Sequence, residues 1–182
     1  MGNILKKITE HRNPYRVLFI GLDAAGKTTI LYKLTSNCPE QIIPTIAFSI
    51  ETIQYNNIHI TAWDVGGRSN LRPLWRHYYP NTNGVVFVID SNDRDRMEDV
   101  IDQFKRFTLE EELLGVPILV FANKADLPKS MTIEEITQQL TKSGIDLSRF
   151  HIIQTIATEG TGLKEGLSWL ENEMQKKRNT FL

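Results

Sequence analysis

An apolar run in this chain leads directly into a glycine-bounded loop that ends in lysine and threonine. Val17 to Ile20 is continuously apolar, as expected for a strand buried on both faces of a parallel sheet. Residues 21–28 then read GLDAAGKT, which matches G-x-x-x-x-G-K-[ST] in a strand–loop–helix setting. That setting disfavours the alternative, a glycine-containing turn before an ordinary helix. The pattern therefore predicts a loop whose backbone N–H groups bind phosphate.

Each part of this loop has an expected task. The Lys27 ammonium is placed to contact the β- and γ-phosphates of a nucleotide, and the Thr28 hydroxyl to ligate Mg²⁺. The residues expected to contact the nucleotide here are Asp23, Ala24, Ala25, Gly26, Lys27, Thr28 and Thr29.

Strand-like and helix-like segments alternate along the rest of the chain. Further strands are predicted at 84–90, 117–122 and 151–156, and helices at 27–36, 95–114, 132–141 and 163–175. Residues 46–64 read as two strands joined near Tyr55-Asn56-Asn57, a hairpin. This order predicts an α/β fold: an open, mostly parallel six-stranded sheet flanked by helices, with ligands at the carboxyl ends of its strands.

Composition narrows the class of protein. The chain has 182 residues, which suits a single domain with its own core. A net charge of −1 gives no case for binding nucleic acid. The single cysteine, Cys38, excludes an intramolecular disulfide and fits a reducing compartment such as the cytosol. We find neither an apolar run of membrane-spanning length nor a secretory signal.

The base of the nucleotide is indicated by Asn123-Lys124-Ala125-Asp126, which follows a buried strand. A carboxylate only accepts hydrogen bonds, so Asp126 can take both N1–H and the exocyclic amine of guanine, which adenine does not offer there. The Lys124 stem can cover the base, and Asn123 can tie the surrounding loops together. Ala157-Thr158, after the next predicted strand, can offer a backbone N–H to the guanine oxygen.

Three further residues complete the expected site as a set, although each alone has an ordinary structural explanation. Asp64 ends the second hairpin strand and is placed to reach Mg²⁺ through water. Gly67 can turn its N–H towards the γ-phosphate, and the Thr45 hydroxyl can ligate Mg²⁺ when GTP is bound.

Taken together, these motifs resemble the ADP-ribosylation factor (Arf) and Arf-like family of small GTPases. The resemblance covers essentially the whole chain and rests on GLDAAGKTT at 21–29, PTIAF at 44–48, WDVGG at 63–67, LRPLWRHYY at 71–79, DSNDR at 90–94 and NKAD at 123–126. It implies a Mg²⁺-dependent GTP/GDP switch that works with an exchange factor, a GTPase-activating protein and effectors. Two loops, near 41–48 and 64–80, would change with the γ-phosphate.

The resemblance also implies a membrane-binding arm at 1–13, before a small GTPase domain at 14–182. It further implies a cytoplasmic protein held reversibly on endomembranes such as the Golgi. Gly2 corresponds to the family's myristoylation site, and Ile4, Leu5 and Ile8 form an apolar face beside Lys6 and Lys7. Lys6 departs from the simple M-G-x-x-x-[ST] pattern, so a packed helix on an unmodified chain is the alternative.

Phe48, Trp63 and Tyr78 match aromatic residues that members of the family present to effectors. The alternative is that these three side chains simply pack in the core. In the family the hairpin slides on its neighbouring strand when GTP binds and expels the arm from a groove. A slide of two residues preserves the faces of the pleat, whereas a slide of one inverts them.

Two positions depart from the usual Arf pattern. Ala47 stands where these proteins generally have glycine, and Arg68 stands where they have glutamine after the double glycine. Arginine has no acceptor, so it cannot hold the attacking water as glutamine does. Three interpretations of Arg68 stay open: it slows hydrolysis, it stabilises transition-state charge in cis, or it faces solvent while another group serves.

The leading hypothesis is an Arf-like switch in vesicle trafficking with slow GTP hydrolysis, in which Gly67 and Arg68 lie at the catalytic position. A GTP-dependent binding module with negligible turnover is the alternative, and a hydrolysis rate separates the two. A nucleotide kinase or ATPase is disfavoured by NKAD and by the length of the chain.

Overall fold

The computed structural model describes residues 15–35, 48–56, 58–65 and 76–180, with the backbone alone for 48–54 and 61–65. Its centre is a six-stranded sheet in the order β2-β3-β1-β4-β5-β6. Only β2 pairs antiparallel among these strands, with β3. The strands are β1 (Tyr15–Gly21), β2 (Phe48–Tyr55), β3 (Ile58–Val65), β4 (Gly84–Asp90), β5 (Ile118–Asn123) and β6 (Phe150–Thr155). The predicted α/β sheet is confirmed.

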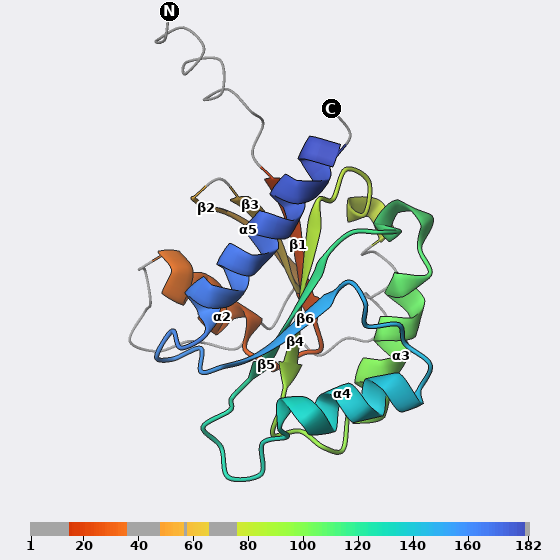
Figure 1. Cartoon of the computed structure of the whole chain (residues 1–182). Helices are drawn as coiled ribbons and strands as arrows, with labels where there is room; N and C mark the ends of the chain where they lie inside the picture. The colour runs from red at the N-terminus through yellow and green to blue at the C-terminus, as the bar shows by residue number, and fades with distance from the viewer. Residues whose placement is uncertain (1–14, 36–47, 57, 66–75, 181–182) are drawn as a thin grey trace, which may run out of the picture.

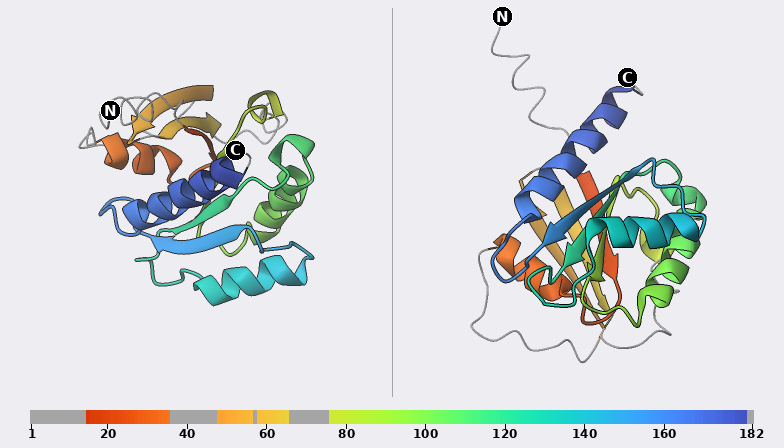
Figure 2. Two further views of the ribbon diagram at one scale, coloured as in Figure 1. Left: turned by 45° about the horizontal axis from the view of Figure 1, so that its top comes forward. Right: turned by 60° about the horizontal axis from the view of Figure 1, so that its bottom comes forward.

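Helices cover both faces of this sheet. Helices α2 (Lys27–Thr35) and α5 (Leu163–Thr180) lie on one face, and α3 (Met97–Thr108) and α4 (Ile133–Lys142) lie on the other, as Figures 1 and 2 show. The expected amphipathic arm at 1–13 lies outside the described residues. No helix in the described part of the chain is long and apolar enough to span a membrane.

Alternation along β4 explains why the sheet has a core on each face. Phe87 packs with Phe104 and Phe107 of α3, with ring centroids 4.3 and 5.6 Å away, while Val86 and Val88 pack on the face of α2 and α5. A strand buried on both faces needs apolar residues at every position, which is why GVVFVID was readable as a strand.

Helix α3 is shorter than the helix predicted at 95–114. It ends at Thr108, and a separate 3-10 turn, η3, covers Glu111–Leu113. The Thr108 hydroxyl donates to the Phe104 carbonyl, and the Arg149 guanidinium donates to the carbonyls of Thr108 and Leu113. The chain leaves the α-helix through a last turn of i→i−3 bonds, from the Leu109 N–H to the Arg106 carbonyl and from the Glu110 N–H to the Phe107 carbonyl.

The last helix was predicted to end at Gln175 and instead runs to Thr180. At its basic end, the Arg178 guanidinium lies 3.9 Å from the centre of the Tyr15 ring. This cation–π contact fixes the end of α5 against the start of β1.

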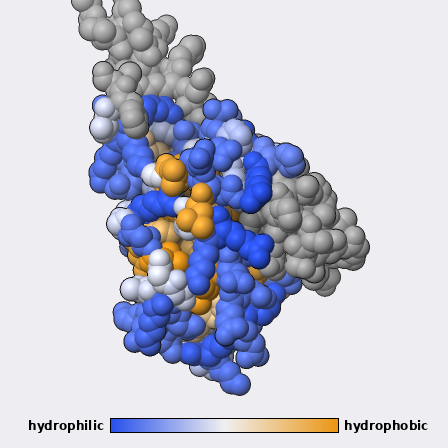
Figure 3. All heavy atoms as spheres, turned by 90° about the vertical axis from the view of Figure 1, so that its right-hand side faces the viewer, coloured by the Kyte–Doolittle hydropathy of each residue, from blue (hydrophilic) through white to orange (hydrophobic). Residues whose placement is uncertain are grey.

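The outer surface over α3 and α4 is mostly hydrophilic, with a small group of hydrophobic side chains among the polar ones (Figure 3). Leu109 and Leu114, which flank η3, are the most exposed large apolar side chains of the described residues.

Candidate functional site

The expected nucleotide residues gather at one edge of the sheet. Gly21 ends β1, Asn123 ends β5 and Thr155 ends β6, and all three strands point the same way. The loops that follow them are therefore neighbours, at the edge where open α/β sheets bind ligands.

Backbone geometry makes the phosphate loop a tight turn. Gly21 has a φ of 150°, and a Cβ there would lie 2.3 Å from the Val88 carbonyl oxygen of β4. Ala24 adopts a φ of 59°, a conformation that L-residues rarely take. The Lys27 ammonium turns back into this loop and donates to the carbonyls of Gly21 and Leu22, at 3.1 and 2.7 Å. The lysine is thereby held, at 2% exposure, inside the loop predicted to bind phosphate.

Asn123 joins three loops through its buried side-chain amide. Its Nδ2 donates to the Ala25 carbonyl at 2.9 Å, and its Oδ1 accepts from the Thr155 hydroxyl at 3.2 Å and from the Ala157 N–H at 3.1 Å. The structure thus shows the tie between loops that the sequence suggested for this residue. The amide is 1% exposed, so these bonds are shielded from water.

Lys124 is held by a residue that the sequence reasoning did not single out. Its ammonium donates to the Asp90 carboxylate at 2.6 Å, and its backbone has a φ of 62°. Ser91, next to Asp90, donates from both its N–H and its hydroxyl to the Asn123 carbonyl. The end of β4 therefore supports the loop that carries the predicted base-binding residues.

A cavity of about 170 Å³ lies between the phosphate loop and this second loop. All but one of its lining residues were predicted to contact nucleotide. They are Gly26, Thr29, Asn123, Lys124, Asp126, Ala157 and Thr158, and the unpredicted one is Leu127. Asp126 is exposed, which leaves its carboxylate accessible to a ligand.

Arg96, the residue directly before α3, contacts the phosphate loop. Its guanidinium donates to the Asp23 carboxylate at 3.1 Å and to the Asp23 carbonyl at 3.2 Å. The same guanidinium donates to the Asp93 carboxylate at 2.6 Å. Burial lowers the pKa of Arg96, but the two carboxylates raise it by more, and the net pKa lies above the ordinary value. Sequence reasoning missed this contact, although DSNDR at 90–94 pointed to the segment.

Mg²⁺ was expected on the hydroxyls of Thr28 and Thr45, and on Asp64 through water. Thr28 is the second residue of α2, directly after the phosphate loop, and Asp64 is paired with Ser49 across the hairpin. The Asp64 side chain and all of Thr45 lie outside what the structure describes. Hydroxyl and carboxylate oxygens are the hard donors that Mg²⁺ prefers, so the proposed donor set fits this ion.

The remaining predicted residues are only partly placed. Phe48 starts β2 and Trp63 lies in β3, with side chains outside the description. Tyr78 is half-buried, with its ring 6.0 Å from the Arg16 guanidinium, and packs against the core on the α3 face. The predictions on Gly2, Thr45, Ala47, Gly67 and Arg68 lie outside the described residues.

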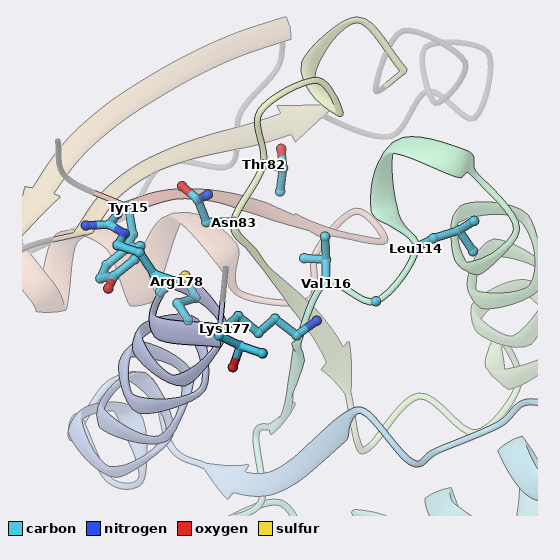
Figure 4. A pocket seen from close by; sticks show the side chains of 10 residues that line it. Tyr15, Thr82, Asn83, Leu114, Val116, Lys177 and Arg178 are labelled. Atoms are coloured by element: carbon cyan, nitrogen blue, oxygen red, sulfur yellow. The ribbon is translucent and has the colours of Figure 1, made fainter. Parts of the chain in front are cut away.

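A larger cavity, of about 740 Å³, lies at the opposite ends of the strands (Figure 4). Tyr15 at the start of β1, Val116 before β5 and Arg178 near the end of α5 contribute to its lining. It is therefore remote from the phosphate loop and adjoins the first described residue of the chain.

A parallel sheet with a phosphate loop after its first strand and N-K-x-D at the end of β5 has the arrangement of the small GTPase fold. A family model described as "ADP-ribosylation factor family" matches residues 1–174, and the chain belongs to this family. Members of the family generally bind guanine nucleotides, hydrolyse GTP and act with exchange factors, activating proteins and effectors.

A solved structure shows the same fold. The chain is similar to the Arl6 BBS3 small GTPase from Trypanosoma brucei, determined with the bound nucleotide analogue GppNp. The two are 32% identical with a TM-score of 0.77, and the match covers 89% of this chain and 98% of the other.

Proposed function

We propose that this chain is an Arf-type switch that binds GTP or GDP with Mg²⁺ and hydrolyses GTP slowly. The observation that carries the proposal is the 170 Å³ cavity, because its lining brings the phosphate loop together with Asn123, Lys124 and Asp126. In this role the Asp126 carboxylate accepts from the guanine edge, and the Ala157-Thr158 segment borders the base.

The phosphates occupy the loop at 21–28. Its N–H groups and the N-terminus of α2 bind the anionic oxygens, and Lys27 exchanges its two carbonyl partners for phosphate oxygens. Thr28, with Thr45 and Asp64, would hold Mg²⁺, which neutralises phosphate charge when bound. Gly67 donates its N–H towards the γ-phosphate.

Slow hydrolysis is proposed from Arg68. Arginine offers five donors and no acceptor, so it does not orient an attacking water as glutamine does. We expect the full chain, purified from bacteria with Mg²⁺, to retain mostly GTP, and Arg68→Gln to retain mostly GDP. Chromatography of the nucleotide released by denaturation measures this.

The same measurement separates the alternatives. GDP on the unaltered chain would contradict slow hydrolysis and favour a cycling switch with a substitute for glutamine. GTP on both proteins would favour the binding module with negligible turnover. ATP would overturn the guanine assignment.

Membrane coupling is the second part of the proposal. We place the protein on the cytosolic face of endomembranes, in vesicle trafficking, through a myristoylated Gly2 and the apolar residues Ile4, Leu5 and Ile8. The cavity beside Tyr15 supports a docking place for the arm in the GDP state, since the arm directly precedes Tyr15. The two-residue hairpin slide would expel the arm when GTP binds, with Phe48, Trp63 and Tyr78 then serving effectors.

The lipid contribution is testable on vesicles. Because a myristoyl chain alone binds only at about 10⁴ M⁻¹, chain and apolar face are both needed for stable attachment. We expect the GTP-loaded, N-myristoyltransferase-treated chain to float with anionic liposomes and Gly2→Ala to stay in solution. Equal flotation of both proteins would contradict acylation of Gly2.

A further inference from the structure

The phosphate loop of this chain contains an acidic residue. Asp23 is the third residue of GLDAAGKT, and its carboxylate is only about one-third exposed. A carboxylate next to bound phosphates repels them, because two like charges in a partly buried site are weakly screened. A loop that carries Asp23 therefore needs a cation that holds this charge.

Arg96 supplies that cation with two parallel bonds. One terminal nitrogen of its guanidinium donates to the Asp23 carboxylate and the other to the Asp23 carbonyl. The planar fork of an arginine suits two acceptors held on neighbouring atoms, and the side chain is itself about two-thirds buried. The bond to the carbonyl also fixes the backbone directly before Ala24, the residue with a φ of 59°.

Asp93 also holds the guanidinium of Arg96 in place. The Asp93 carboxylate accepts from the Arg96 side chain at 2.6 Å and from the Arg96 backbone N–H at 3.2 Å. The Asp93 N–H donates to the carbonyl of Asp90, whose carboxylate holds Lys124. A continuous set of contacts thus runs from the predicted base-binding loop to the phosphate loop.

We infer that Arg96 is a positioning residue for nucleotide binding, which neutralises Asp23 and holds the phosphate loop in its binding conformation. This inference rests on the proposed function, since it concerns the same site. A triphosphate carries more charge than a diphosphate, so losing Arg96 weakens GTP retention more than GDP retention.

The test is the release rate of fluorescent GDP and of a fluorescent non-hydrolysable GTP analogue from the full chain with Mg²⁺. We expect Arg96→Gln to release the diphosphate about three- to tenfold faster and the triphosphate analogue faster still, since a charge-assisted pair is lost. Asp23→Asn, added to Arg96→Gln, restores most of the retention because the uncompensated carboxylate is gone.

Arg94→Gln is the matched control. Arg94 lies two residues before Arg96 in the sequence. Its guanidinium donates two hydrogen bonds to the Glu135 carboxylate, at 2.9 and 3.1 Å, and these bonds do not involve the phosphate loop. Its release rates are expected to stay within about twofold of the unaltered chain. Arg96→Lys, which keeps the charge and loses the fork, carries the test if Arg96→Gln unfolds. Its release rates are expected to be faster than those of Arg94→Gln.

Three results overturn the inference. If the unaltered chain binds guanine nucleotide and Arg96→Gln (or Arg96→Lys, where that variant is needed) matches Arg94→Gln, the inference alone fails. If Arg96→Gln speeds both nucleotides equally and Asp23→Asn does not reverse it, the arginine serves stability and not the charge of the loop. An unaltered chain that binds no guanine nucleotide overturns the proposed function and the inference with it.

Discussion

Replacing Asp126 by asparagine is expected to lower the affinity for GDP and GTP by about 10²- to 10⁴-fold, since two charge-assisted hydrogen bonds are at stake. Asparagine has one acceptor oxygen and an NH₂ group. The NH₂ group would face the exocyclic amine of guanine, donor against donor. Because Asp126 is exposed and lines the cavity, the substitution changes the ligand contact without opening the core.

The same chemistry predicts which base the variant prefers. Xanthine carries a carbonyl oxygen where guanine has its amine, so the asparagine NH₂ then meets an acceptor. Asp126→Asn should bind xanthosine diphosphate more tightly than GDP, as measured by competition against fluorescent nucleotide. Asp102→Asn, an exposed aspartate of α3, is the control and should bind GDP like the unaltered chain. Unchanged GDP affinity in Asp126→Asn would remove this carboxylate from the base site.

Asn123→Ala is expected to lower the free energy of unfolding by about 3 kcal/mol or more and to abolish stable nucleotide retention. The substitution removes the partners of the Ala25 carbonyl, the Thr155 hydroxyl and the Ala157 N–H together. Buried groups left without a hydrogen bond lose their solvation and gain nothing in return. Urea unfolding measures the change.

Thr155→Val gives the graded comparison. Valine has a shape similar to that of threonine, so the substitution removes only the hydroxyl's bond to Asn123. Asn123 still accepts from the Ala157 N–H. We expect a loss of about 1 kcal/mol and nucleotide binding close to that of the unaltered chain. Equal losses in both variants would show that the amide does not act as a joint between loops.

The fold was predictable wherever local pattern and burial agree. Residues 84–90 are apolar at nearly every position, and β4 has those bounds. Thr132 and Glu135 have the T-x-x-E spacing of a capping box, and the structure contains both of its hydrogen bonds at the start of α4 (Ile133–Lys142). In each case the deciding contacts lie within one strand or one helical turn, so the sequence alone contains the signal.

Contacts between distant segments were not predictable in this way. The carbonyl of Thr108, the last residue of α3, accepts from Arg149, which lies 41 residues further along the chain. Asp23 and Arg96 are 73 residues apart, and neither hydrophobic periodicity nor spacing links them. The predicted nucleotide residues do gather around one cavity, because loops after parallel strands share an edge, while their roles remain predictions.

The reach of Asn123 also sets an order of events during protein synthesis. Its bonds join Ala25, 98 residues earlier, to Ala157, 34 residues later. The chain therefore lacks the complete lining of the 170 Å³ cavity until residue 158 has been made and β6 has paired with β5. Loop closure over such separations is slow compared with local helix formation. Nucleotide binding is thus expected late in the synthesis and folding of this protein. A chain that has bound nucleotide has already formed nearly the whole sheet.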